Sequence, residues 1–257
     1  MLFDTHAHLN DKKFAEDLPQ VVDRAMQAGV TRIANIGFDV PSSVLAVKIA
    51  KQYPGMYAVI GAHPHDAKTL DKEALFKLEI LAREPQVVAV GEIGLDYYYD
   101  LSPREVQKKA FREQIHLAKD LKKPIVIHDR DAHQDTMEIL KEEKAGEYRG
   151  IIHCFSGSWE MARQCMSLGF YIALGGPVTF ANAKKLLDIA RLVPLEYLLI
   201  ETDSPYLSPH PFRGKRNEPA RVRLVAEKIA ELRGIPLEDL IAATTNNALG
   251  IYGIKDN

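Results

Sequence analysis

Two histidines separated by a single residue, His6 and His8, stand near the start of the chain. Residues two apart project to the same side of an extended segment, whereas on a helix they point about 200° apart. Two imidazoles on one side of a strand can bind a single metal ion, because neutral imidazole is a common metal ligand. The same spacing also occurs in solvated histidines at the start of a loop, so the pair alone is a weak indication of a metal site.

Further residues of metal-binding type follow apolar segments. Glu92 follows VVAVG, His128 and His153 end IVIH and IIH, and Glu201 and Asp203 stand in YLLIETD. Each alone has an ordinary structural explanation: a salt bridge for either glutamate, a backbone hydrogen bond for either histidine and a turn cap for Asp203. An unpaired buried carboxylate is very costly, however, so Glu92 requires a partner or a metal ion. The repetition of such residues at equivalent positions favours one shared site.

Four imidazoles and two carboxylates are sufficient for two divalent metal ions. We expect the ligands to be His6, His8 and Asp203 for the first ion and His128 and His153 for the second, with Glu92 as a bridge between them. Two ions about 3.5–4 Å apart that share a carboxylate and a water lower the pKa of the water and promote hydrolysis. The candidates are magnesium, manganese, zinc or a similar ion, and the many histidines favour zinc, manganese, iron or cobalt over magnesium.

Eight apolar segments rich in β-branched residues must position these side chains, and helical periodicity alternates with them. The segments predicted as strands are 2–5, 31–36, 56–61, 87–91, 124–128, 149–153, 170–174 and 197–202. Eight strand–helix alternations in 257 residues are typical of a (β/α)8 TIM barrel, in which the carboxyl ends of the strands form the catalytic face. An open, doubly wound sheet is the alternative. No linker, low-complexity segment or repeat divides the chain, and we expect one domain, 1–257.

The composition is that of a soluble globular protein. The chain is 46% hydrophobic and 26% charged with a formal net charge of −2, which excludes intrinsic disorder and any general attraction to polyanions. The presence of only two cysteines, the lack of a signal-peptide pattern and the lack of an apolar run of about 18 residues predict a cytoplasmic protein without a membrane span. No heptad or apolar stripe predicts a dimer, and we expect a monomer.

A basic segment, residues 210–223, follows the last predicted strand. Arginine binds phosphate oxygens through parallel hydrogen bonds, so we expect Arg213, Lys215 and Arg216 to bind the backbone of a nucleic acid without distinguishing its sequence. A solvated helix start with salt bridges is the ordinary alternative. Three adjacent tyrosines, 97–99, follow Glu92, and one or two of them, with Tyr97 as the first candidate, could stack on a terminal base. Packing at the core or rim is the commoner role of such residues.

Seven segments of the chain, in this order, resemble the signature motifs of the TatD family of metal-dependent deoxyribonucleases, which is related to the amidohydrolase superfamily. They are HAHLN, GAHPH, GEIGLDYY, IVIHDRDA, HCFSG, ETDSPYL and RGKRNEP, and they span essentially the whole chain. The resemblance implies a (β/α)8 barrel, a site for one or two metal ions and hydrolysis of phosphodiesters, usually as an exonuclease on DNA. It also implies metal binding by His6, His8, Glu92, His128, His153 and Asp203, and an active-site role for His63.

Three residues are expected to take part in catalysis, namely Asp203, His63 and Glu201. Asp203 could orient the attacking water, and Glu201 could support a metal ligand. His63 could donate a proton to the leaving oxygen or bind a phosphate oxygen, and a structural role in its loop is the alternative. We expect His65 to be an ordinary loop residue.

The motifs together predict a metal-dependent deoxyribonuclease that removes nucleotides from DNA ends, with RNA or tRNA as further nucleic-acid partners. A dinuclear site attacks a carbonyl carbon equally well, so hydrolysis of a carbonyl ester or amide, such as the ester of an aminoacyl-tRNA, is the second hypothesis. The third hypothesis is a non-catalytic barrel that binds metal or nucleic acid. The complete set of ligands argues against it.

Overall fold

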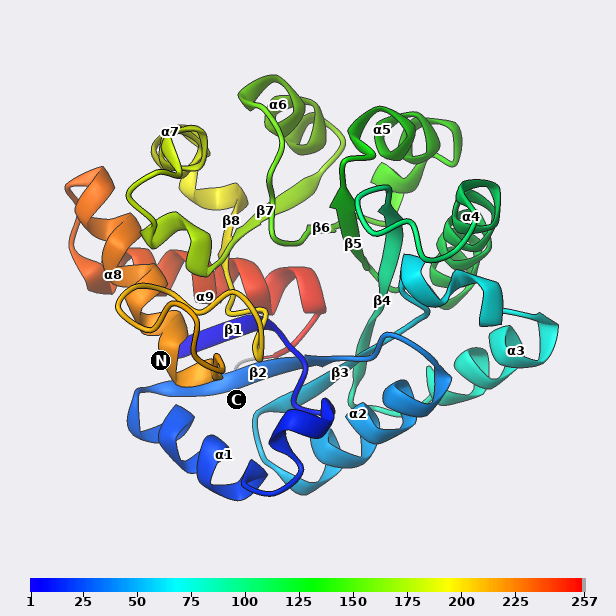
Figure 1. Ribbon diagram of the computed structural model, residues 1–257, viewed down its shortest axis with the longest axis horizontal. Helices are drawn as coiled ribbons and strands as arrows, with labels where there is room; N and C mark the ends of the chain where they lie inside the picture. The colour runs from blue at the N-terminus through cyan, green and yellow to red at the C-terminus, as the bar shows by residue number, and fades with distance from the viewer. Residues whose placement is uncertain (256–257) are drawn as a thin grey trace.

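The computed structural model describes residues 1–255, in which eight strands form one parallel sheet (Figure 1). The strands are β1 (Leu2–Ala7), β2 (Val30–Ile36), β3 (Met56–Ile60), β4 (Val87–Asp96), β5 (Ile125–Arg130), β6 (Gly150–Ile152), β7 (Phe170–Leu174) and β8 (Leu198–Ile200). Each strand pairs with the next one along the chain, and helices alternate with the strands. This arrangement confirms the predicted TIM barrel and excludes the open, doubly wound sheet.

Helices surround the barrel, and one further helix lies across its end (Figure 1). They are α1 (Leu18–Gln27), α2 (Val40–Gln52), α3 (Lys72–Leu81), α4 (Arg104–Leu121), α5 (His133–Glu142), α6 (Trp159–Ser167), α7 (Lys184–Leu192), α8 (Val222–Arg233) and the end helix α9 (Leu237–Tyr252). Short 3-10 helices are η1 (Lys12–Phe14), η2 (Pro64–Thr69), η3 (Ala145–Glu147), η4 (Gly176–Thr179), η5 (Leu195–Tyr197) and η6 (Pro219–Arg221). Within residues 1–255, no helix combines the length and the apolar character needed to cross a membrane.

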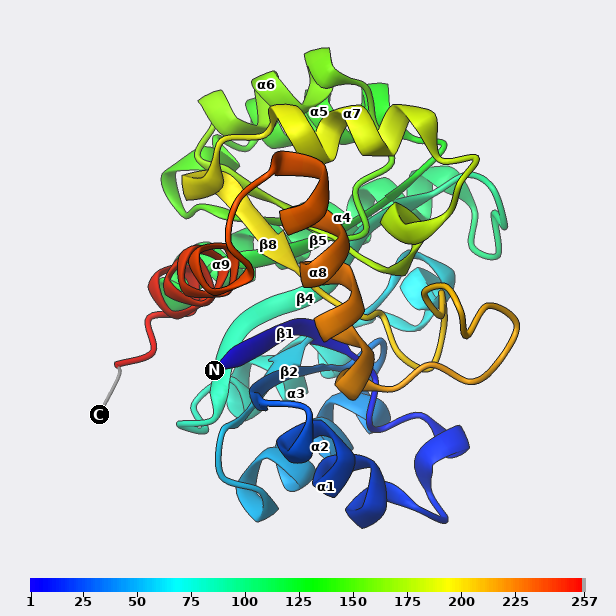
Figure 2. The same cartoon turned by 90° about the vertical axis from the view of Figure 1, so that its left-hand side faces the viewer.

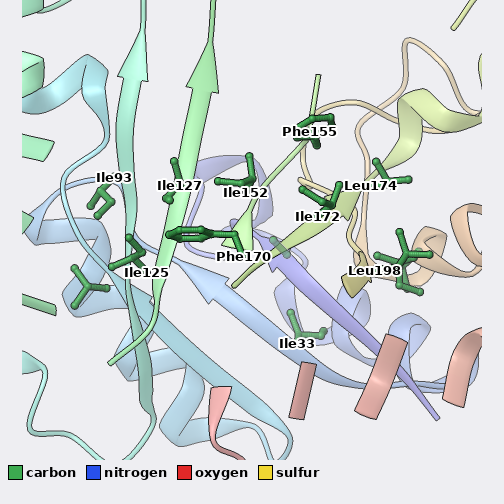
Figure 3. Close-up of a cluster of buried hydrophobic side chains, with 14 of the residues drawn as sticks. Ile33, Ile93, Ile125, Ile127, Ile152, Phe155, Phe170, Ile172, Leu174 and Leu198 are labelled. Carbon is green, nitrogen blue, oxygen red and sulfur yellow. The ribbon is translucent and has the colours of Figure 1, made fainter. Parts of the chain in front are cut away.

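The core has two layers because successive side chains of a strand point to opposite faces of the sheet. One layer packs between the strands and the surrounding helices, and Figure 3 shows part of it, including Ile125, Ile172 and Leu198. The other layer comes from the alternate strand positions and contacts the last turns of α9. Figure 2 shows α9 at the end of the barrel opposite the β8 loop, residues 201–218. Because α9 covers the amino ends of the strands, the carboxyl ends are left for a functional site.

Hydrogen bonds between β1 and the segment after β8 join the two ends of the sheet. The backbone N–H of Asp203 donates to the carbonyl of His6 (2.8 Å), and that of His8 donates to the carbonyl of the residue after Asp203 (2.7 Å). Next to these bonds, the hydroxyl of Thr202 donates to the fully buried carboxyl of Asp4 (2.5 Å). This seam brings His6 of β1 and His8, which follows the strand, beside Asp203.

β4 is longer than its apolar pattern predicts. The pattern predicts a strand over 87–91, whereas β4 continues through Glu92 to Asp96. β5 is also longer than predicted, and the two strands remain paired until Asp96 lies opposite Arg130. The pairing supplies backbone hydrogen bonds to residues beyond the apolar run, so Glu92 is held within a strand. By contrast, β6 and β8 are short, and His153 and Asp203 follow their ends.

Replacing Thr202 with valine tests the seam. Valine has nearly the shape of threonine but cannot donate to Asp4, so we expect the free energy of unfolding to fall by about 1–3 kcal/mol. Urea denaturation in the presence of a chelator measures the change without a contribution from bound metal. The matched control is Thr31→Val, because the buried hydroxyl of Thr31 has no hydrogen-bond partner within residues 1–255. Equal unfolding free energies for the two variants would contradict this role of the seam.

Candidate metal centre

A cleft of about 600 Å³ opens at the carboxyl ends of the strands. Six residues with predicted roles line it, four histidines and two acidic residues. They are His8, His63, Glu92, His128, His153 and Asp203. His6 is fully buried, and its ring stacks on that of His153 with the ring centroids 3.7 Å apart. The structure therefore brings the six predicted metal ligands together, and His63, which is predicted to act in catalysis, lies beside them.

The first group of ligand atoms consists of Nε2 of His6, Nε2 of His8, Oε2 of Glu92 and Oδ1 of Asp203. The two nitrogens are 3.2 Å apart. The two carboxylate oxygens lie 3.4–3.8 Å from the nitrogens. Four ligand atoms about 2.1 Å from a tetrahedral ion are about 3.4 Å from one another. The spacing of this group therefore fits a divalent metal ion.

The other oxygen of Glu92, Oε1, faces a different group of imidazoles. It lies 2.8 Å from Nδ1 of His128, 3.1 Å from Nε2 of His153 and 3.6 Å from Nε2 of His63. Glu92 thus presents one oxygen to each of two imidazole groups, which is the arrangement that a bridging carboxylate requires. The sequence assigns His128 and His153 to this group, and the structure adds His63 to it.

Hydrogen bonds to the far nitrogens orient two of the imidazoles. Nδ1 of His8 donates to the backbone carbonyl of Ile36 (2.9 Å), and Nδ1 of His153 lies 3.2 Å from Oε1 of Glu201. A ring nitrogen that donates leaves the lone pair of the other nitrogen for a metal ion. Glu201 is fully buried and also accepts the backbone N–H of Cys154 (2.6 Å). Its carboxylate therefore lies on the far side of His153 and is not among the described residues that line the cleft.

A carboxylate that the sequence does not single out, Asp96, supports the opposite side of the site. Its Oδ2 lies 2.8 Å from Nε2 of His65 and 3.1 Å from Nε2 of His128. Its Oδ1 accepts two backbone N–H groups of the following turn. His65, expected to be an ordinary loop residue, therefore belongs to the lining of the cleft. Alternation along β4 places Asp96 on the same side as Glu92, but the apolar pattern ends before Asp96.

The imidazoles also control the charge of the buried carboxylates. Burial raises the pKa of the Glu92 carboxyl, but the neighbouring imidazoles, above all that of His153, hold this pKa well below its usual range. Burial likewise raises the pKa of Asp203, and the hydrogen bond from His8 together with the nearby imidazoles lowers it further than burial raises it. Both carboxylates are therefore ionised at neutral pH, as metal ligands must be.

Arg216, expected to bind a phosphate backbone, belongs instead to an ion-pair network with α1 and its preceding turn. Its guanidinium donates to both carboxylate oxygens of Asp17 (2.8 and 2.6 Å). Arg24 of α1 forms a second bidentate pair with Glu218, at the end of the β8 loop. These ion pairs hold the β8 loop against α1 and the turn that precedes it. The side chain of Arg216 is thus engaged in a structural contact away from the cleft.

The other expected substrate contacts, Arg213, Lys215 and Tyr97, are not among the described residues that line the cleft. The guanidinium of Arg213 lies over the ring of Phe180, 4.6 Å from its centre, and Lys215 is exposed on the β8 loop. Tyr97 donates its hydroxyl to the carboxylate of Asp135 (2.6 Å). Local sequence could not reveal these partners, because Phe180 and Asp135 lie more than 30 residues away along the chain.

A family model described as "TatD related DNase" matches residues 3–253 of the chain. The protein belongs to this family. The matched range contains all the residues around Glu92 described above, from His6 to Asp203. The match confirms the resemblance that the sequence motifs carry, and it makes the protein a TatD-family chain over nearly its whole length.

Individual TatD-family relatives also match the chain from end to end. It is 50% identical over 255 residues to "Uncharacterized metal-dependent hydrolase YabD" of Bacillus subtilis (strain 168), with 99% of this chain and 100% of the relative covered. It is 35% identical over 263 residues to "3'-5' ssDNA/RNA exonuclease TatD" of Klebsiella pneumoniae (strain 342), with 100% and 99% covered. The solved structure of YJJV, a TatD homologue from Escherichia coli K12, has a TM-score of 0.93 at 32% identity and covers 99% of this chain and 98% of its own. The chain is thus a member of a family of metal-dependent hydrolases.

Replacing Glu201 with glutamine tests whether its carboxylate orients the ring of His153, a predicted metal ligand. The amide keeps the shape of the carboxylate but loses its charge, so we expect the affinity for a metal ion to fall about 10- to 100-fold. Titration of Zn²⁺ against a competing chelator measures this affinity. The control is Glu196→Gln in η5, which should leave the affinity unchanged. An unaltered affinity in Glu201→Gln would contradict the positioning role.

Metal binding should also depend on pH. Burial lowers the pKa of His128, but hydrogen bonds with Asp96 and Glu92 raise it to about 9. Since only the unprotonated imidazole binds metal, an ion must displace this proton, and we expect the apparent affinity for Zn²⁺ to rise as the pH is raised from about 6 to about 9. The same competition titration at several pH values, corrected for the chelator, measures the slope. A constant affinity would show that the site holds no proton to displace.

Proposed function

We propose that this protein is a metal-dependent phosphodiesterase that removes nucleotides from DNA ends. The observation that carries the proposal is the position of Glu92, whose two oxygens face two separate imidazole groups in the cleft. Two divalent ions bound there would lower the pKa of water and would stabilise the charge that develops on a phosphodiester during hydrolysis. We assign one ion to His6, His8 and Asp203 and the other to His128 and His153, with Glu92 between them.

Asp203 has the environment of a residue that orients the attacking water. Its side chain is 15% exposed and lines the cleft, whereas that of Glu201 is completely buried. Because its pKa is held low, the carboxylate is ionised at neutral pH and accepts hydrogen bonds. A carboxylate at this position can hold a water against the substrate and receive its proton. We therefore assign Asp203 both ligand and catalytic roles.

His63 is arranged as a hydrogen-bond donor to the substrate. Its Nδ1 accepts the backbone N–H of His65 (3.1 Å), so the hydrogen of the neutral ring is on Nε2. Burial holds the pKa of His63 well below its usual range, so the ring is neutral. A neutral imidazole is a weak acid but a good donor, and we therefore assign Nε2–H to a non-bridging phosphate oxygen.

Similarity supports nucleic acid as the substrate. The relative from Klebsiella pneumoniae carries the name of a 3'-5' exonuclease of single-stranded DNA and RNA. We therefore propose DNA as the substrate and RNA as a second one, with digestion from the 3′ end. We further propose a cytoplasmic monomer that consists of one domain, as the composition and the absence of a linker suggest.

Replacing Asp203 with asparagine should retain the fold and lower hydrolysis about 1,000-fold or more, because the variant loses the charge that binds metal and orients water. The backbone of Asp203 is left-handed (φ 54°), a conformation that asparagine also adopts readily. Release of mononucleotides from an end-labelled single-stranded oligonucleotide, with manganese, magnesium, zinc or a chelator, measures the activity. The control Asp188→Asn, an exposed residue of α7, should act like the wild type.

Two outcomes would overturn this proposal. Wild-type turnover by Asp203→Asn would remove Asp203 from the mechanism. If the wild type released no product with any of the three metals, the proposed phosphodiesterase activity would be excluded. An aminoacyl ester assayed in parallel then decides whether the same centre hydrolyses a carbonyl substrate.

A further inference from the structure

Two exposed tyrosines and one arginine stand together at the rim of the metal cleft. The side chains of Tyr98 and Tyr99 are 59% and 53% exposed, and their rings meet edge to face with centroids 5.0 Å apart. Cζ of Arg130 lies 4.0 Å from the centre of the Tyr98 ring and 4.8 Å from that of Tyr99. Tyr99 and Arg130 line the same cleft as Glu92. We call these three residues the tyrosine–arginine platform.

The platform is held in place by the residues that position the metal ligands. Oδ1 of Asp96 accepts the backbone N–H groups of Tyr98 (3.0 Å) and Tyr99 (2.8 Å), while its Oδ2 contacts the ring of His128. The backbone N–H of residue 97 donates to the carbonyl of Arg130 (2.9 Å). A surface that is ordered before its ligand arrives loses little conformational entropy on binding. The turn is therefore suited to hold a ligand at a defined place beside the metal centre.

The neighbouring Tyr97 shows what a purely structural tyrosine of this turn looks like. Its hydroxyl is bonded to Asp135, its ring lies under the guanidinium of Arg104, and it packs against the hydrophobic core. By contrast, more than half of the surface of each platform tyrosine is exposed. Arg130 is exposed as well, and within residues 1–255 it forms no ion pair with a carboxylate. The platform thus combines apolar ring surface with an uncompensated positive charge.

We propose that the tyrosine–arginine platform stacks on the unpaired terminal base of the strand that is being cleaved. Aromatic rings and an arginine plane are the groups on which nucleobases stack in single-strand binding proteins. Such a contact accepts every base, because each has a π face, but it requires a base that is not covered by duplex neighbours. The inference rests on the proposed phosphodiesterase activity and adds to it the residues that hold the terminal base beside the metal centre.

The test compares Tyr99→Ala with the wild type on two oligonucleotides, one with a normal terminal nucleotide and one with an abasic terminal nucleotide at the digested end. We expect the wild type to cleave the normal oligonucleotide with a kcat/KM about tenfold or more above that for the abasic one. In Tyr99→Ala this ratio should fall towards one. The matched control is Phe76→Ala on α3, an aromatic side chain that is 57% exposed away from the cleft and should leave the ratio unchanged. A ratio in Tyr99→Ala equal to that of the wild type overturns the proposal.

A second measurement keeps this result separate from the proposed activity. If the wild type hydrolyses neither oligonucleotide, the proposed function fails, and stacking is then judged by the fluorescence of a terminal 2-aminopurine base in the presence of a chelator. Quenching by the wild type and by Phe76→Ala, but not by Tyr99→Ala, supports the platform. Equal fluorescence with the wild type and Tyr99→Ala overturns it, whether or not the protein is a nuclease.

Discussion

Closing the sheet between its first and last strands is the constraint on which the rest of this structure depends. Two backbone hydrogen bonds join β1 to the segment after β8. One runs from the N–H of Asp203 to the carbonyl of His6, and the other from the N–H of His8 to the carbonyl of Ser204. The same bonds therefore complete the barrel and place the histidines within 4 Å of the Asp203 carboxylate. Stability of the seam and the geometry of the first ligand group cannot be separated, since a shift of one strand past the other would move these atoms apart.

Burial of the Glu92 carboxylate is the second determinant of the site. A carboxylate that is 3% exposed is tolerated only with strong partners, and here each of its oxygens faces imidazoles. Burial raises its pKa and the imidazoles lower it, and the imidazoles together have the larger effect. The imidazoles that stabilise the buried charge therefore also place nitrogen atoms on both sides of the carboxylate.

Two further carboxylates contact the imidazoles of the cleft from the side away from Glu92. Glu201 contacts the far nitrogen of His153, and Asp96 contacts His128 while it also holds the turn that carries the tyrosine–arginine platform. Each fixes a ring whose orientation would otherwise be free. The outer helices and the ion pairs of Arg216 and Arg24 hold the loops around this centre, so residues far from the cleft determine its shape.

The sequence by itself determined the fold class and the types of residue at the site. Alternating apolar segments predict the barrel, and the repetition of histidines and carboxylates after apolar segments, among them Glu92 and His128, predicts one shared metal site. Only the tertiary structure decided the partners. Arg216 forms an ion pair with Asp17, and Tyr97 donates a hydrogen bond to Asp135. Asp96 belongs to the site because β4 continues beyond its apolar run. Periodicity and residue type are local properties that the chain carries along its length. Ion pairs and hydrogen bonds between distant segments depend on distances that exist only once the barrel has closed.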